Sequence, residues 1–211
     1  MRWIPLLCAL LSLAACDEST PPAGAADAGP PDLGGTDAGV GGTDAGTDAG
    51  APPGGPTCPP AGPYGTAVND LAADFTLMDC DGAPHTLHEL CDRQAVWLFE
   101  FADWCPPCRS FARSEVNRIY ERFEGESFAA YFVISEDDGF GEPSAETCAE
   151  IRDRYGLTMP VLFDPGTTFE DTLGVASNEV NVVLREGGVI AWKGRYAADR
   201  AEGTIEAVLS E

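Results

Sequence analysis

The chain has 211 residues, of which 12 are Lys or Arg and 35 are Asp or Glu, which gives a formal net charge of −23. So acidic a chain is poorly suited to nucleic acid or to anionic lipid surfaces, because both are bound by basic side chains. No apolar run reaches the about 18 residues that a transmembrane helix requires, and eight cysteines are many for a cytosolic protein, in which thiols are kept reduced.

The N-terminus has the form of a secretory signal. Arg2 supplies one positive charge, and residues 4–15 are almost wholly apolar. The segment Leu13-Ala14-Ala15-Cys16 resembles a bacterial lipobox, whose cysteine becomes the lipidated first residue of the mature protein. This resemblance implies a signal peptide over residues 1–15 and a chain anchored to the cell envelope by a lipid on Cys16, facing the periplasm or the exterior. An ordinary signal peptide with a chance cysteine is the alternative.

Residues 16–57 are predicted to form a lipidated, disordered spacer. After Cys16 this segment contains no Lys, Arg or aromatic residue and consists mostly of Ala, Gly, Pro, Thr and Asp. Such a composition cannot bury enough apolar surface to offset the entropy lost on ordering. A calcium loop needs carboxylates at a fixed alternate spacing, whereas the Asp-Ala-Gly repeats of this segment are irregular. They begin at Asp27, Asp37, Asp44 and Asp48.

Residues 58–211 are predicted to form one folded domain, since they hold every Phe and Tyr and all Trp residues except Trp3. Alternation and turn signals predict an N-terminal hairpin, and near-continuous apolar runs predict strands covered on both faces. Helical spacing of apolar residues marks the segments between them. The predicted strands cover 74–79, 85–87, 95–101, 128–134, 181–184 and 189–193, and the predicted helices cover 108–123, 144–155 and 201–209, an order typical of an α/β layer fold.

The motif Trp104-Cys105-Pro106-Pro107-Cys108 lies where a predicted strand meets a predicted helix. Two cysteines at this spacing can close a small disulfide, and the partial positive charge at a helix N-terminus favours the thiolate of the first cysteine. That thiolate can exchange disulfides through a mixed-disulfide intermediate. Both prolines suit the first helical turn, where a missing N–H is tolerated. The motif therefore favours thiol–disulfide exchange.

Two structural interpretations of the motif remain as alternatives. A zinc site needs about four ligands, usually from a second Cys-x-x-Cys or a His pair. The chain has no second pair of that spacing, and only His85 and His88 could complete an improvised site. An inert structural disulfide is the other alternative.

Residues 101–109 resemble the active-site segment of thioredoxin-fold proteins. The longer sequence around them resembles the TlpA/ResA branch of membrane-tethered thiol–disulfide oxidoreductases. Asp74-Phe75-Thr76-Leu77 with Asp81-Gly82 resembles the N-terminal hairpin of that branch, and residues 159–164 resemble its central insertion. The likeness covers about residues 64–209. It implies a thioredoxin-like α/β fold with a central mixed sheet, helices on both faces and an N-terminal hairpin.

The same resemblance implies roles for the motif. Cys105 would be the attacking thiol and Cys108 the resolving thiol, while Trp104 would help to shape the docking surface. The implied partners are protein thiols or disulfides and an unidentified electron donor, with neither a cofactor nor a metal. Because Pro106 and Pro107 have no N–H to offer the thiolate, we expect a mildly lowered pKa for Cys105 and a reducing protein.

The acids near the motif depart from the family pattern. Thioredoxins often carry a buried acid six residues before the first active-site cysteine, where this chain has Phe99, and ResA-like chains carry one after the second cysteine, where it has Phe111. Glu100 instead occupies a position that the family usually keeps apolar. A carboxyl in a buried strand is costly unless it is hydrogen-bonded or protonated. Glu100 is therefore either a proton acceptor for Cys108 or, as we favour, a structural or edge residue.

The loop that faces the cysteines departs from the family pattern as well. Thioredoxin-fold enzymes place a cis-proline there, just before a hairpin strand. Residues 173–190 match this loop and hairpin without gaps and place Glu179 at the proline position, whereas Pro160 precedes a short apolar run with no hairpin after it. We therefore expect Glu179 within contact distance of Cys105, after a trans or strained peptide bond. A carboxylate there raises the pKa of the thiolate.

The cysteines outside the motif are expected to form two structural disulfides. Cys8 leaves with the signal peptide and Cys16 is lipidated, so an even number remains. Three pairings are possible. We favour a local bridge between Cys80 and Cys91, which leaves Cys58 to pair with Cys148.

The favoured function is that of a membrane-tethered, extracytoplasmic thiol–disulfide oxidoreductase that reduces protein disulfides. A copper-binding protein of the Sco type resembles Cys-x-x-x-Cys with a distant His, but the spacing here is two and no His follows His88. Peroxiredoxins carry a hydroxyl residue three positions before the reactive cysteine, where this chain has Ala102. A redox-inert binding module on the same fold is the remaining alternative.

Overall fold

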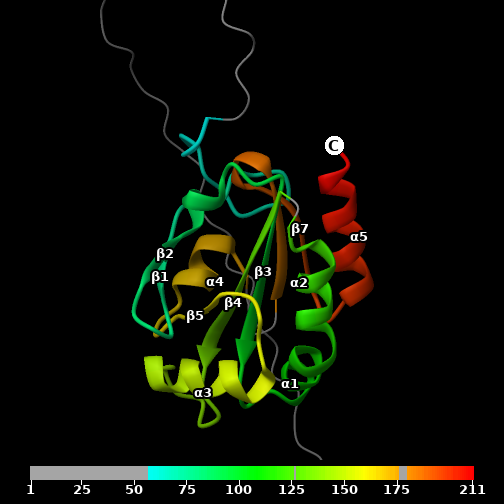
Figure 1. Cartoon of the computed structure of the whole chain (residues 1–211). Coiled ribbons are helices and arrows are strands. Elements are labelled where there is room, and N and C mark those ends of the chain that lie inside the picture. Colours follow the sequence, from blue (N-terminus) through cyan, green and yellow to red (C-terminus); the bar gives the residue numbers. More distant parts are fainter. Residues whose placement is uncertain (1–56, 126, 176–179) are drawn as a thin grey trace, which may run out of the picture. The chain divides into compact units, whose positions relative to one another are not determined.

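The computed structural model describes residues 57–125, 127–175 and 180–211 (Figure 1). Their centre is a sheet in the order β2-β1-β5-β4-β3-β6-β7. The β3–β4 and β4–β5 pairs are parallel and all other neighbours are antiparallel, so the predicted mixed sheet is confirmed. The strands are β1 (Thr76–Asp79), β2 (Pro84–Thr86), β3 (Ala95–Ala102), β4 (Phe128–Glu136), β5 (Val161–Phe163), β6 (Val180–Arg185) and β7 (Val189–Arg195).

Helices cover both faces of the sheet, as predicted. The side chains of β3 alternate between two cores: Trp97 and Phe99 lie in one, and Val96 and Leu98 in the other. All eight residues of this strand are buried. The first core is covered by α1 (Pro106–Phe111), η2 (Ala112–Val116), α2 (Asn117–Phe123), α3 (Ala145–Tyr155) and α5 (Ala198–Leu209), and the second by α4 (Thr168–Leu173), η1 (Leu87–Leu90) and the segment before β1.

The helix predicted over 108–123 begins two residues earlier and is not uniform. Pro106 and Pro107 are its first two residues, and residues 112–116 form a π-helical turn between α1 and α2. The C-terminal helix likewise begins at Ala198 instead of residue 201. Helix boundaries depend on caps that periodicity alone does not locate.

The sequence analysis missed α4. Its six residues are too few to show helical periodicity. The helix is held by Asp164, whose carboxylate accepts hydrogen bonds from the backbone nitrogens of Gly166 (3.1 Å) and Phe169 (2.7 Å). It ends at Gly174, which has the left-handed φ of 61° that glycine tolerates.

The expected disulfide pairing is wrong. Cys58 pairs with Cys91 and Cys80 with Cys148, with Cα–Cα distances of 5.6 and 5.1 Å. Cys80 follows the far end of β1, whereas β2 carries the chain back, so that the backbone of Leu87 bonds to that of Phe75. The hairpin therefore separates Cys80 from Cys91. It brings Cys80 against α3, in which Cys148 is buried.

Three sequence predictions fall outside the described residues. These are the signal peptide, the lipidated Cys16 with nearly all of the spacer, and Glu179. Within the described ranges, no helix is long and apolar enough to cross a membrane.

Candidate active site

The cysteine pair lies at the carboxyl end of β3, where the chain turns into α1 (Figure 1). Cys105 is the residue before the helix, and its sulfur accepts a hydrogen bond from the backbone nitrogen of Cys108 at 3.4 Å. The two residues are joined by a disulfide, with a Cα–Cα distance of 5.3 Å. Cys105 keeps 4% of its surface exposed and Cys108 none. A second sulfur-containing molecule can therefore reach Cys105 more readily than Cys108.

Tyr196 contacts the same sulfur and was missed by the sequence analysis. Its hydroxyl oxygen lies 3.4 Å from Cys105 Sγ, and it donates the hydrogen bond because a disulfide sulfur carries no proton. Tyr196 lies between β7 and α5 with φ of 35°, a left-handed value that is unusual for a non-glycine residue. It also lines a pocket of about 330 Å³ together with Pro107 and Phe111. No motif marks it, because only the β6–β7 hairpin brings it to the site.

Trp104 is fixed beside the cysteines by two contacts. Its Nε1 donates a hydrogen bond to Glu136 Oε2 at 2.6 Å. Its ring stacks on Phe140, with centroids 4.8 Å apart and an interplanar angle of 26°. Both partners belong to the end of β4 and the turn after it, so two neighbouring parallel strands build this part of the surface.

Two ion pairs to one buried carboxylate hold the turn before Cys105. The Asp103 carboxylate is almost fully buried and lies 3.2 Å from Arg109 Nε and 2.6 Å from Arg154 Nη1. The hydrogen bond to Asp103 raises the pKa of Arg154. Since the guanidinium groups come from α1 and α3, they tie both helices to the residue that precedes Trp104.

Glu100 is fully buried in β3, which has β4 and β6 on its two sides, so the predicted edge placement is wrong. Neither carboxylate oxygen has a hydrogen bond of normal geometry within the described residues. Burial raises the pKa of Glu100 to about 8, and the charges of Glu170 and Asp164 act in the same direction. The Ser135 hydroxyl offsets this only in part. The carboxyl is therefore predominantly protonated at neutral pH.

Glu100 lies on the face of the sheet opposite to the cysteine pair. Phe99 stacks on Phe111 of α1, with ring centroids 4.9 Å apart, and belongs to the same core as Cys108. Since neighbouring side chains of a strand point to opposite faces, Glu100 points toward α4. This placement favours a structural role over the alternative of a proton acceptor for Cys108.

Glu179, which is predicted to face the cysteines, is not among the described residues. The strand that follows, β6, pairs antiparallel with β3, with Asn181 opposite Phe99. The beginning of β6 thus lies at the end of the sheet where β3 leads to Cys105. Pro160 instead precedes β5, and its carbonyl bonds to the middle of β4 at Phe132. Contact between Glu179 and Cys105 stays a prediction.

The two histidines have structural partners. His85 Nε2 lies 3.0 Å from Asp79 Oδ2, and the buried His88 Nε2 lies 3.0 Å from the carbonyl oxygen of Ala72. In the part of the chain that the structure describes, no group of three or more His, Cys, Asp or Glu side chains could hold a metal ion.

A mixed sheet with helices on both faces, and a Cys-x-x-Cys disulfide between the central strand and its helix, define a thioredoxin-fold protein of the class that includes thiol–disulfide oxidoreductases. The chain belongs to the AhpC/TSA family, whose model matches residues 68–197. It is similar to thiol-disulfide oxidoreductase ResA of Halalkalibacterium halodurans, with 27% identity over 119 residues. That match covers 56% of this chain and 63% of the relative, which is less than two thirds of its length.

Solved structures share the fold. A candidate protein disulfide isomerase of Bacteroides thetaiotaomicron aligns with a TM-score of 0.59 and 24% identity, over 70% of this chain and 93% of that one. Peroxidoxin BcpB of Mycobacterium tuberculosis aligns with a TM-score of 0.55 and 18% identity, over 66% and 96% of the two chains. Likeness at this level of identity shows the fold alone.

Proposed function

We propose that this protein is a thiol–disulfide oxidoreductase that reduces protein disulfides through Cys105 and Cys108. The observation that carries the proposal is the placement of the pair. Cys105 precedes the first turn of a helix and keeps exposed surface, while Cys108 is buried directly behind it. This is the arrangement that a two-step exchange needs, because the first sulfur must meet the substrate and the second must not.

In the reduced protein the Cys105 thiolate attacks one sulfur of the substrate disulfide. A bond forms between Cys105 and that sulfur, and the other substrate sulfur leaves as a thiolate that takes up a proton. Cys108 then loses its proton and attacks Cys105 Sγ, which releases the second substrate thiolate. Two electrons have passed to the substrate, and the protein holds the disulfide seen in the structure. An external dithiol or protein donor must restore the reduced pair.

The groups around Cys105 would set its thiolate stability. The backbone nitrogen of Cys108 and the hydroxyl of Tyr196 are directed at its sulfur. Pro106 and Pro107 donate no backbone hydrogen bond to this sulfur, because proline lacks an N–H. We therefore infer a mildly lowered pKa for Cys105 and a potential in the reducing range. Glu179 matches the cis-proline position in the resembled family by sequence, and a carboxylate in contact with Cys105 would raise that pKa.

The chain would work on the outer side of a membrane, with residues 1–15 removed, a lipid on Cys16 and residues 16–57 as a spacer to the domain of residues 58–211. The lipobox-like segment and the spacer composition support this arrangement. The disulfides Cys58–Cys91 and Cys80–Cys148 also suit an oxidising compartment. Labelled palmitate should enter the full chain in a bacterial host but not a Cys16→Ser variant. Equal labelling of the two would contradict lipidation at Cys16.

The activity is tested by insulin reduction with dithiothreitol. The protein should accelerate insulin precipitation, and Cys105→Ser should abolish the acceleration. A prereduced Cys108→Ser variant, mixed with insulin after dithiothreitol has been removed, should accumulate a mixed disulfide between Cys105 and the substrate, because no resolving thiol remains. Absence of acceleration, or a trapped adduct on Cys108 in the Cys105→Ser variant alone, would contradict the assignment. Equilibration with glutathione should give a potential well below that of DsbA; a potential near the DsbA value would contradict the reducing role.

A further inference from the structure

The turn between β4 and α3 displays an aromatic ring to solvent. Phe140 is 68% exposed and has φ of 63°, a left-handed value that few non-glycine residues adopt. Asp137 fixes the turn, since its Oδ1 accepts hydrogen bonds from the backbone nitrogens of Gly139 (2.8 Å) and Gly141 (2.7 Å). Its own backbone nitrogen donates to the carbonyl of Gly141 at 2.9 Å. The turn thus holds Phe140 outward in an unfavourable backbone conformation.

This ring continues the surface of the cysteine motif. Phe140 stacks on Trp104, which immediately precedes Cys105, and Trp104 is held in place by Glu136. A polypeptide bound through its own cysteine to Cys105 would meet Phe140 where it extends across the ring of Trp104. We call residues 136–142, together with the ring of Trp104, the aromatic–acidic turn.

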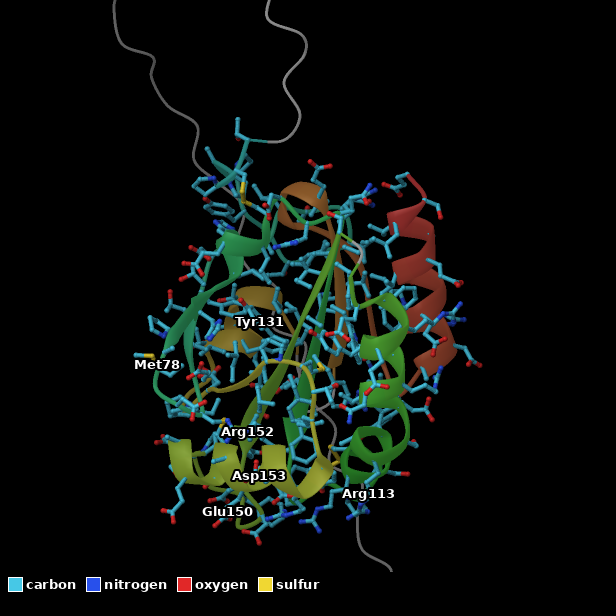
Figure 2. All side chains as sticks on the ribbon, in the orientation of Figure 1. Met78, Arg113, Tyr131, Glu150, Arg152 and Asp153 are labelled. Atoms are coloured by element: carbon cyan, nitrogen blue, oxygen red, sulfur yellow. A yellow bond between two sulfur atoms is a disulfide. The ribbon has the colours of Figure 1, made fainter. Side chains whose placement is uncertain are left out.

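The charges on this side of the site have one sign. Residues 136–151 contain six acids and no Lys or Arg. Asp138 and Glu142 are exposed next to Phe140, and Figure 2 shows Glu150 on α3. The cations that follow in α3 and α1 are already paired with acids: Arg152 with Asp81 and Asp153, and Arg109 and Arg154 with Asp103. Arg113 lies over the ring of Tyr155, at 5.5 Å from its centroid.

We propose that the aromatic–acidic turn is a docking surface for a cationic segment of the protein substrate, with Lys or Arg a few residues from its reactive cysteine. The inference rests on the proposed reductase function and adds a substrate class to it. A Lys or Arg side chain over the face of Phe140 gains a cation–π contact. The carboxylates of Asp138 and Glu142 attract the same group, and the strong negative charge of the chain steers cationic partners toward it.

Two short disulfide peptides test the docking surface. They are identical except that the residues flanking the cysteine are Lys in one and Glu in the other. At low salt the reduced protein should consume the Lys peptide at least about tenfold faster in kcat/KM, and the ratio should fall toward one as salt screens the charges. Asp138→Asn with Glu142→Gln should lower the ratio about threefold or more. Glu121→Gln with Glu124→Gln, which removes two exposed acids at the end of α2, should leave it unchanged.

Substitution of Phe140 separates the contribution of the aromatic ring from that of the carboxylates. Phe140→Leu keeps an apolar side chain but removes the aromatic face, so it should lower the ratio of the rates with the Lys and Glu peptides. The rate with a neutral small disulfide, such as 2-hydroxyethyl disulfide, is the control that reports the exchange reaction without docking. Equal rates for the two peptides, with the small disulfide still reduced, would overturn the docking proposal alone. A small disulfide that is not reduced would instead overturn the proposed function. Dimerisation that Phe140→Leu abolishes, seen by sedimentation, would assign the ring to a contact between copies and overturn the proposal.

Discussion

Replacement of Glu100 by Gln should remove a large pH dependence of stability. The carboxyl is fully buried, and burial together with Glu170 and Asp164 raises its pKa from 4.5 to about 8. Between those two values the folded protein holds a proton on Glu100 that the unfolded chain has released. The free energy of unfolding therefore falls as pH rises, by about 1.4 kcal/mol per pH unit. Over the interval of about 3.5 units, the loss is at most about 5 kcal/mol.

Urea unfolding of the oxidised protein at pH 5, 6.5, 8 and 9 measures this effect. In that state the disulfide cysteines do not titrate, so their ionisation does not contribute. The free energy difference between the Glu100→Gln variant and the unmodified protein should rise with pH and should level off above about pH 8. At pH 5 the variant should have no advantage, because Glu100 is protonated in the folded state and a buried amide still lacks partners.

The matched control is Glu150→Gln, which removes an exposed carboxylate on α3 (Figure 2). Its free energy difference from the unmodified protein should stay flat over the same pH range. A difference for Glu100→Gln that is equally flat from pH 5 to pH 9 would refute the reasoning, because it would show that Glu100 titrates alike in the folded and unfolded chain. Glu170→Gln should move the midpoint of the Glu100 effect to lower pH, since it removes the like charge that contributes most to the raised pKa of Glu100.

Two further predictions concern the sulfur atoms. Cys80→Ser with Cys148→Ser opens a loop of 68 residues, so urea unfolding should show a loss of about 4 kcal/mol, while a loss below about 1 kcal/mol would argue against this bridge. Tyr196→Phe removes the hydroxyl that donates to Cys105, so thiol titration should show the pKa of Cys105 raised by about 0.5 to 1 unit. An unchanged pKa would mean that the hydroxyl does not act on the thiolate.

The sequence predicted those parts of the molecule that local patterns control. The long apolar runs gave β3 and β4, and the position of Cys105 at a strand–helix junction followed from the run before it and the helical spacing after it. Local patterns could not predict on which face of the sheet Glu100 lies, or with which cysteine Cys80 pairs. The first depends on which side of the sheet each helix covers, and the second on where a hairpin carries the chain.

The site residues that the sequence analysis missed share one property. Tyr196 lies 91 residues from Cys105 and reaches it only because β7 returns beside β6 at that end of the sheet. Phe140 lies in a turn whose form depends on one carboxylate, that of Asp137, and on two glycines. Neither belongs to a motif, and a positive φ at an aromatic residue has no sequence signature. Topology and turn chemistry, not residue type, place them.

The unequal burial of the two sulfurs of the Cys80–Cys148 bridge has a consequence for the proposed exchange reaction. A copy with reduced Cys105 and Cys108 would be surrounded by other copies that carry the same bridge. Exchange requires a thiolate to approach a sulfur along the line of its bond to the other sulfur. Cys148 is fully buried, whereas Cys80 keeps 9% of its surface exposed. A thiolate from a neighbouring molecule would therefore attack this bridge at Cys80, and Cys148 would be the sulfur that leaves, still held inside α3.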